Sequence, residues 1–327
     1  MSKAKRLLVT GGAGYIGSHM VAMLLDQGHG VVTLDDLSKG RRDNVLGGTF
    51  HKGDVGDKAL LEEILLGAEK IDGVLHFAAS IEVGESVEEP DKYILNNYTK
   101  TLPLLELLAE RGGPALVFSS TAAIFGSPQY LPINENHPKA PENPYARSKL
   151  MVEDALEDLA LGGLKYVSLR YFNAAGADPA GRLGEFHDAP SHLIPRAIRV
   201  AGGLDGALSV HGRDYATADG TGVRDYIHVS DLCKAHLLAL ERLWAGGASA
   251  CYNLGNGRGF SVLEVVEALQ KVAGRDIPLE FGPRRAGDIA QLVADSRRAG
   301  EELGWKPEHG DLESILADAW RWHLKKR

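Results

Sequence analysis

Short apolar runs alternate with longer stretches of helical periodicity through the first half of the chain. The apolar runs predict buried strands, because they are brief, rich in β-branched and aliphatic residues, and bounded by polar residues or glycine. They lie at Arg6–Val9, Val31–Leu34, Gly73–Phe77, Ala115–Ser119 and Tyr166–Arg170. The helical stretches lie at residues 15–27, 58–66, 91–110 and 145–161. Strands separated by helices indicate βαβ units and an α/β fold, with a doubly wound parallel sheet covered on both faces.

The second half of the chain has a weaker pattern. Gly, Pro, Asp and His are frequent between residues 174 and 225, which predicts long loops. Regular elements return at 230–244, 261–273 and 311–324. We expect a smaller C-terminal lobe over the C-terminal edge of the sheet, where open α/β sheets bind ligands. The predicted domains are residues 1–175 and 176–327, with a soft boundary that the chain can cross again to extend the sheet.

Composition narrows the classes of partner. The 327 residues are 44% hydrophobic and 24% charged, with a net charge of −8 and both signs interspersed. Nucleic acid is therefore not expected as a partner, although a phosphorylated small molecule needs only a local basic pocket. Cys233 and Cys251 form no CxxC pattern, so we expect free thiols, no zinc site and no other metal site. The basic N-terminus has too short an apolar run for a signal peptide, and no run approaches the ~20 apolar residues of a membrane span. These features predict a cytoplasmic protein with no membrane partner.

A glycine-rich segment, Thr10–Gly17, directly follows the first predicted strand and opens a helix. Its glycines allow a tight turn and close approach to a pyrophosphate, whose charge the helix N-terminus attracts. A carboxylate at Asp35, where the next strand ends, can accept from adenosine ribose hydroxyls, and Asp36 follows it. An acid here without an arginine immediately after it favours NAD over NADP. Asp54 follows a probable third strand and can meet the adenine amino group, although a solvated loop acid fits its position too.

Tyr145 and Lys149 lie four residues apart at the start of a predicted helix, which places them on one face. There the Lys149 ammonium can lower the pKa of the Tyr145 phenol from about 10 and make it a general base for an alcohol. Taken alone, a Tyr and a Lys at this spacing are more often two surface residues of a helix than a catalytic pair. Thr121 strengthens the catalytic reading, because it follows a strand whose C-terminal end faces the same crevice. Its hydroxyl can bond the reacting oxygen.

These motifs, with His76–Ala79 and Asn96, occur in the order and spacing of a known superfamily. The sequence resembles the extended short-chain dehydrogenase/reductases, which have a Rossmann-type sheet. Within them it resembles the UDP-glucose 4-epimerase family over essentially the whole chain. The most specific matches are residues 83–87, 170–177, 192–195 and 219–229.

The resemblance implies an NAD-dependent interconversion of UDP-glucose and UDP-galactose, with inversion at the sugar 4-position through a transient 4-keto intermediate. It implies an NAD-binding domain over residues 1–175, a mainly UDP-sugar-binding lobe over 176–327, and a homodimer formed by helices near 91–110 and 145–161. The implied catalytic residues are Thr121, Tyr145 and Lys149. The implied NAD-binding residues are Gly11, Gly14, Tyr15, Ile16, Gly17, Asp35, Asp36, Asp54, Val55, Phe77, Ala78, Ala79, Asn96, Ser119, Tyr145, Lys149 and Tyr171. The implied substrate-binding residues are Thr121, Asn173, His192, Leu193, Arg224, Arg285, Asp288 and Leu292.

Within the substrate set, the resemblance assigns Arg224 and Arg285 to the diphosphate and Asp288 to a uridine ribose hydroxyl. The chain departs from some family members in three places. Ile81 replaces a lysine, His211 replaces an aromatic residue near the diphosphate, and Leu292 replaces a bulky tyrosine that walls the sugar pocket. A smaller residue at the last position goes with acceptance of N-acetylated sugars, and leucine is intermediate.

Other functions stay open at this point. Epimerases of other UDP-sugars, including N-acetylhexosamines, uronic acids and pentoses, share these motifs. A sugar-nucleotide 4,6-dehydratase would need an acid and a base after the threonine, where this chain has Ala122 and Ala123. A non-catalytic dinucleotide-binding regulator could lose Tyr145 or Lys149, and both are present here.

Overall fold

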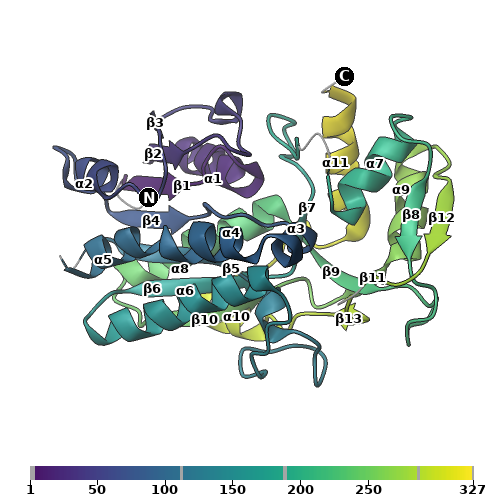
Figure 1. The fold of residues 1–327 in the computed structure, drawn as a ribbon. Coiled ribbons are helices and arrows are strands. Elements are labelled where there is room, and N and C mark those ends of the chain that lie inside the picture. The colour runs from purple at the N-terminus through teal and green to yellow at the C-terminus, as the bar shows by residue number, and fades with distance from the viewer. Residues whose placement is uncertain (1–3, 111–112, 187–189, 286–287, 326–327) are drawn as a thin grey trace. The chain divides into compact units, whose positions relative to one another are not determined.

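Residues 4–110, 113–186, 190–285 and 288–325 are described by the computed structural model (Figure 1). The chain divides into two units, each assembled from separate stretches. Unit 1 consists of Met1–Ile124, Pro141–Arg170 and Cys233–Tyr252. Unit 2 consists of Phe125–Ala140, Tyr171–Leu232 and Asn253–Arg327. Among the described residues, no helix is both long enough and apolar enough to cross a membrane.

A seven-stranded sheet forms the centre of unit 1. Its strands are β1 (Arg6–Thr10), β2 (Gly30–Asp35), β3 (Thr49–Lys52), β4 (Gly73–His76), β5 (Ala115–Thr121), β6 (Tyr166–Tyr171) and β10 (Ala250–Leu254). Their order is β10-β6-β5-β4-β1-β2-β3, and β1 pairs in parallel with both β2 and β4. The chain winds outward in both directions from β1, which creates a switch point between β1 and β4, where such sheets bind ligands. Strand β10, from the second half of the chain, lies at one edge of the sheet beside β6.

Helices cover both faces of this sheet. The long ones are α1 (Tyr15–Asp26), α2 (Lys58–Leu66), α5 (Leu102–Glu110), α6 (Pro144–Leu161) and α8 (Val229–Trp244). On one face, Leu8, Val74 and Leu116 pack in a core with residues of α2, α5 and α6, and Figure 1 shows α5 and α6 side by side. On the other face, a Cβ at Gly73 would lie 3.0 Å from Leu240 of α8. The predicted doubly wound α/β fold is therefore confirmed.

One predicted helix is wrong in detail. The stretch 91–110 is not continuous: α3 (Val83–Glu88) and α4 (Pro90–Tyr93) are followed by a π-helical turn, η2 (Ile94–Thr99), and only then by α5. Pro103 has no N–H for a bond back to Thr99, so it favours a new helix start. Asn97 adds a local reason, because its buried amide bonds Ser80 and Ser148. Two short 3-10 turns, η1 (Arg42–Asn44) and η3 (Ala122–Phe125), complete the unit's elements.

Unit 2 contains two small sheets. In the first, β9 (Val223–His228) lies between β11 (Gly259–Ser261) and β13 (Gln291–Leu292), and β7 (Asn173–Ala175) also pairs with β9. The second pairs β8 (Leu208–His211) with β12 (Leu279–Gly282). The helices are α7 (Leu193–Ala201), α9 (Val262–Ala273), α10 (Arg297–Leu303) and α11 (Leu312–Lys325).

Helices α7, α9 and α11 build the core of this unit, in which Ile194, Val265 and Ile315 are buried together. The prediction of long loops over residues 174–225 is partly wrong, because α7, β8 and the start of β9 lie there. The missed signal is the helical spacing of buried residues along α7, at Ile194, Ala197, Ile198 and Ala201.

Candidate active site

The glycine loop between β1 and α1 has no room for larger residues. Gly11 has a positive φ of 70°, and a Cβ there would lie 2.6 Å from the nitrogen of Ala78. A Cβ on Gly17 would overlap the Gly11 carbonyl oxygen. Gly14 caps α1 without a side chain, so the helix begins with its backbone toward the loop. Tyr15 and Ile16 form the first residues of that helix, as the cradle for a pyrophosphate requires.

Asp35 and Asp36 have different environments. Asp35 is buried at the end of β2, where its two carboxylate oxygens accept from the backbone N–H groups of Ala13 at 2.9 Å and Leu37 at 2.8 Å. Burial raises the pKa of Asp35, and these two hydrogen bonds oppose the rise. Asp36 is exposed and accepts from Ser38. Asp35 is therefore the acid that belongs to the glycine loop, and Asp36 lies beside it in solvent.

Asp54 is ion-paired, which the sequence did not indicate. It accepts from the Lys100 ammonium and from the Gly56 N–H at 2.8 Å. Burial acts to raise the pKa of Asp54, but the hydrogen bonds outweigh it and hold this pKa below its usual value. Val55 points into the core. An adenine amino group would therefore share the Asp54 carboxylate with Lys100.

The segment after β4 lies against the glycine loop. Phe77 donates its N–H to the carbonyl oxygen of Thr10 at 3.0 Å, and Ala78 and Ala79 follow it. Asn96 donates its side-chain amide to the Ser80 hydroxyl at 3.0 Å. The structure thus gathers these cofactor candidates at the switch point of the sheet.

Thr121, Tyr145 and Lys149 also lie in unit 1, at the end of β5 and the start of α6. The Lys149 ammonium donates to the Ser119 carbonyl oxygen at 2.9 Å, and the Thr121 hydroxyl bonds the Tyr145 phenol. Thr121 and Lys149 are buried, and Tyr145 is partly buried. Asn143 caps α6 by accepting from the Ala146 N–H, which fixes where the helix begins. The structure therefore brings the three predicted catalytic side chains together.

The electrostatics of this set differ from the expectation. Burial raises the pKa of Tyr145, opposed only by the hydrogen bond from Thr121. Burial also lowers the pKa of Lys149 to about 7. The protein alone therefore does not depress the Tyr145 pKa, because desolvation of the phenol outweighs an ammonium that is half-charged near neutrality.

Two buried polar groups behind this set were missed. Glu153, one turn after Lys149, pairs with Arg170 of β6 through a 2.6 Å contact. His76 of β4 bonds the hydroxyls of Thr10 at 2.6 Å and Thr101 at 3.0 Å. Burial, with the Lys149 charge, lowers the pKa of His76 to about 3, so its ring is neutral. His76 is in the motif His76–Ala79 and Arg170 is in the matched segment 170–177, but neither pattern indicated these buried contacts.

Apart from Thr121, the substrate candidates lie in unit 2, as does Tyr171, one of the cofactor candidates. Asn173 is on β7 beside Tyr226 of β9, and His192 caps α7, whose first residue is Leu193. Arg224 of β9 is opposite Leu292 of β13.

Two of the charged candidates lie close together. The N–H of Asp288 donates to the carbonyl oxygen of Arg285 at 3.3 Å. Burial and the Arg285 charge lower the pKa of His211, and the Asp288 charge opposes them. Burial and the Asp288 charge raise the pKa of Tyr215, and the charges of Arg284 and Arg224 act against them. Asp288 therefore acts on both His211 and Tyr215, together with Arg285 at the first and Arg224 at the second, so these charges belong to one region of unit 2.

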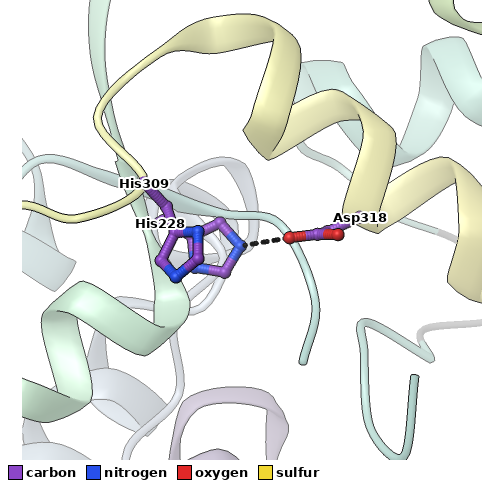
Figure 2. A group of neighbouring side chains, drawn as sticks. All are labelled: His228, His309 and Asp318. Carbon is purple, nitrogen blue, oxygen red and sulfur yellow. Dashed lines mark ion pairs between the residues drawn. The ribbon is translucent and has the colours of Figure 1, made fainter. Parts of the chain in front are cut away.

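A separate group in unit 2 has the composition of a metal site. His228, His309 and Asp318 place their ligand atoms within 4.8 Å of one another (Figure 2). However, the Ser230 N–H donates to His228 Nδ1 at 3.0 Å, so the ring carries its proton on Nε2. That nitrogen faces Asp318 Oδ2 at 3.3 Å. A metal ligand needs a free lone pair at this atom, so the group is better suited to join α11 to β9 than to hold an ion.

Comparison with known proteins identifies the family. Residues 7–255 match the model of the NAD dependent epimerase/dehydratase family. The chain belongs to this family. It is 50% identical over 318 residues to the UDP-glucose 4-epimerase of Halalkalibacterium halodurans, covering 97% of this chain and 95% of that protein.

Solved structures of this family agree with the fold. The UDP-glucose 4-epimerase of Brucella ovis in complex with NAD is 46% identical, with a TM-score of 0.94 over 97% of this chain and 98% of that chain. The enzyme of Bifidobacterium longum in complex with NAD⁺ and UDP is 40% identical, with a TM-score of 0.92 over 98% of each chain. The UDP-Glc/GlcNAc 4-epimerase of Campylobacter jejuni is 41% identical, with a TM-score of 0.85 over 98% of this chain and 100% of that chain. The predicted Rossmann-type fold, epimerase family and NAD cofactor are confirmed.

Proposed function

We propose that this protein interconverts UDP-glucose and UDP-galactose by inverting the sugar 4-position through a transient 4-keto sugar. The observation that carries the proposal is the set at the end of β5 and the start of α6, in which Lys149 is anchored on the Ser119 carbonyl oxygen and the Thr121 side chain acts to lower the pKa of Tyr145. A phenol so placed can remove a proton from an alcohol, which is the step that an epimerase needs.

The glycine loop and Asp35 fit NAD, because the loop offers backbone where any Cβ would collide and Asp35 lies beside it. The other residues that would hold NAD are those of the segment 77–79, with Asn96, Asp54 and Tyr171. NAD, when bound, would supply the acceptor of the sugar C4 hydride and, once reduced, its donor on the return step, and in its oxidised form a positive ring charge. We infer that this charge, added to that of Lys149, overcomes the burial that raises the pKa of Tyr145 in the protein alone.

The remaining steps belong to side chains of the protein. Tyr145, as phenolate, takes the proton of the 4-hydroxyl and later returns it. Thr121 donates to the reacting oxygen, and Lys149 holds the nicotinamide ribose. The 4-keto sugar turns about its link to the diphosphate and presents its other face, so the UDP must be held firmly while the sugar moves.

The residues proposed to hold UDP are in unit 2. Arg224 and Arg285 would bind the diphosphate in bidentate fashion, and Asp288 would accept from a ribose hydroxyl. Asn173, His192 and Leu193 would border the nucleotide sugar. Their support is the hydrogen bond from the Asp288 N–H to the Arg285 carbonyl oxygen, together with the Asp288 charge, which acts on both Tyr215 and His211.

A wider substrate range is the second candidate. Leu292 lies on β13 opposite Arg224 and is less bulky than tyrosine. We infer that the pocket admits some N-acetylhexosamine, and the Campylobacter jejuni relative is a UDP-Glc/GlcNAc 4-epimerase. Ala122 and Ala123 after Thr121 leave the 4,6-dehydratase alternative without its proton handlers.

We also infer a cytoplasmic homodimer without nucleic acid as a partner. Leu95, with 52% of its surface exposed, offers an apolar side chain on the proposed dimer segment 91–110. The net charge of −8 disfavours nucleic acid as a partner. Light scattering of the purified protein tests the dimer.

The test of function is turnover. Purified protein is given UDP-galactose or UDP-glucose separately, and both sugars are measured with time. Approach to the same equilibrium mixture from both sides is expected, with transient absorbance of the reduced nicotinamide, because the proposed reaction transfers a hydride to it. Absence of turnover with both sugars contradicts the proposal. Additional turnover of UDP-N-acetylglucosamine, supplied in a parallel assay, favours the second candidate.

A further inference from the structure

A buried ion pair lies next to the catalytic set in unit 1, between a glutamate of α6 and an arginine of β6. Glu153 of α6 has no exposed surface, and Arg170 of β6 has 2% exposed. Arg170 Nε donates to Glu153 at 2.9 Å and Nη2 donates to its second oxygen at 2.6 Å. The Ser120 hydroxyl donates to the first oxygen at 2.6 Å. The carboxylate is therefore held at both oxygens by its own partners.

Without Arg170, Lys149 would be the natural partner of this acid. Lys149 and Glu153 are four residues apart in α6, and side chains at that spacing are neighbours on one helix face. Yet the Lys149 ammonium donates to the Ser119 carbonyl oxygen and lies 5.0 Å from the centre of the Phe118 ring. Arg170 is ion-paired with Glu153, and the Lys149 ammonium lies instead on the side of the reacting groups.

We propose that Arg170 is a positioning residue for the proton transfer: by holding both oxygens of Glu153, it keeps that carboxylate from capturing the Lys149 ammonium. The inference rests on the proposed function, in which the Lys149 charge favours the Tyr145 phenolate. The ordinary alternative is that the pair only fastens α6 to β6, as buried ion pairs commonly do. The two readings predict different pH profiles.

The other ionisable groups around the set do not replace Glu153 in this role. His76 faces Lys149 from β4, but its ring is neutral because its pKa is about 3. Tyr93 of α4 lies edge-on to Tyr145 at 6.5 Å and donates to Glu85 at 2.7 Å, and burial raises the pKa of Tyr93. Lys92 also pairs with Glu85 at 2.6 Å, so that carboxylate already has two partners. Glu153 is therefore the acid whose release would reach Lys149.

The test compares the NAD-bound enzyme with Arg170→Met, Glu153→Gln and the double variant, measuring kcat for UDP-galactose against pH. In Arg170→Met, the Glu153 carboxylate loses its arginine partner and offsets the Lys149 charge, which raises the pKa of Tyr145. The acid limb of the kcat–pH profile should therefore move to higher pH by about one unit, the size of effect that a neighbouring charge produces. In Glu153→Gln, the Arg170 charge is no longer balanced by a carboxylate and favours the Tyr145 phenolate. The acid limb of the profile should therefore move to lower pH. The double variant should return the limb close to that of the wild type. KM should be unchanged throughout.

A matched control is Arg298→Met, which breaks an exposed pair with Glu302 at 2.8 Å and should leave the limb in place. A crystal structure of Arg170→Met gives a direct second readout. The Lys149 ammonium should leave the Ser119 oxygen and move to within ion-pair distance of Glu153. An ammonium that stays on Ser119 in a folded Arg170→Met protein overturns the proposal.

Single variants that move the limb in the same direction, or a double variant that stays displaced, indicate a structural clamp and also overturn it. If Arg170→Met does not fold, Glu153→Gln decides, because a folded and active Glu153→Gln protein with an unshifted limb is incompatible with the proposal. Failure of the proposed function is recognised separately, since it appears as absence of turnover in the wild type.

Discussion

The Lys149 ammonium and the Ser119 carbonyl oxygen are joined by a hydrogen bond of 2.9 Å. This bond ties the first turns of α6 to the end of β5, two residues before Thr121 bonds the Tyr145 phenol. The helix and the strand therefore present their catalytic side chains as one rigid set. Rigid support of this kind is what allows a buried phenol to meet a substrate hydroxyl in productive geometry.

Replacement of Tyr145 tests the base. In Tyr145→Phe the ring still packs beside Tyr93, so the fold and the bound NAD should survive. The phenol oxygen is lost, so kcat should fall by ~10²–10⁴-fold, as expected for loss of a general base. The measurement is UDP-galactose turnover and nicotinamide absorbance, alongside NAD content. Thr121→Ser should be mild and Thr121→Val severe, because the hydroxyl and not the methyl bonds the phenol. Full activity in a folded, NAD-bearing Tyr145→Phe protein would sink the mechanism.

Asp35 should decide between NAD and NADP. Its buried carboxylate faces the glycine loop, so the 2′-phosphate of NADP would meet a like charge. Asp35→Asn should weaken NAD binding by about 1.5–3 kcal/mol, the range for a charged hydrogen bond, and raise the ratio of NADP to NAD affinity. Titration of each nucleotide into the protein measures both effects. Asp158→Asn, at an exposed position of α6, is the control. Equal binding of the two nucleotides by the wild type would contradict the role of Asp35.

Asp225 should make stability depend on pH. This carboxylate has no exposed surface and accepts from the N–H groups of Asn256 and Gly257 at 2.8 and 2.9 Å. Burial nevertheless raises its pKa to about 6, and the backbone hydrogen bonds oppose the rise. As pH rises from about 4 to 6, the unfolded chain loses this proton before the folded protein does, so stability falls across that window and is then constant. A shift of about two units corresponds to roughly 3 kcal/mol.

Comparison with Asp225→Asn isolates this contribution. The variant should be less stable at every pH, because an amide cannot accept from all the backbone donors. The advantage of the wild type in urea unfolding should be largest near pH 4 and should shrink toward pH 7. An advantage that grows with pH would show that the folded protein holds the charged form of Asp225.

Much of this site could be predicted from local patterns in the sequence. The contacts between distant segments could not be predicted in this way. The glycine loop and the Tyr145–Lys149 spacing are short-range features, which a sequence displays directly. The pairing of Glu153 with Arg170 joins residues 17 positions apart across a helix and a strand. Asp225 binds backbone 31 and 69 positions away, at Asn256 and Ala294. Neither acid looks different in sequence from a surface residue.

The raised pKa of Tyr145 has the same origin. Its spacing from Lys149 indicated a charge effect, but the depth of burial is set by the whole core. The π-helical turn at Ile94–Thr99 likewise depends on Asn97 finding Ser80 and Ser148, which no periodicity indicates.

The diphosphate anchors can be tested one at a time. Arg224→Ala or Arg285→Ala should weaken UDP binding by about 1.5–3 kcal/mol, because each removes a charged hydrogen-bond donor. NAD content should be unaffected, since the cofactor cradle lies in unit 1 and both arginines lie in unit 2. Calorimetric titration with UDP gives the affinity, and Arg275→Ala, at an exposed position, is the control. Unchanged affinity in both variants would place the substrate elsewhere.

Leu292 should set the range of sugars. It is partly buried on β13, directly opposite Arg224 in the pairing with β9, so it lies beside the strand whose Arg224 would hold the diphosphate. Tyrosine there would fill space that an N-acetyl group needs. Leu292→Tyr should therefore lower turnover of UDP-N-acetylglucosamine while sparing UDP-galactose, and the readout is the ratio of kcat/KM for the two substrates in each protein. An added ring that merely overpacked a core position would lower both rates together, because overpacking perturbs the strand and not one sugar. Equal loss on both sugars would therefore assign Leu292 to the core, whereas a selective loss would assign it to the sugar pocket.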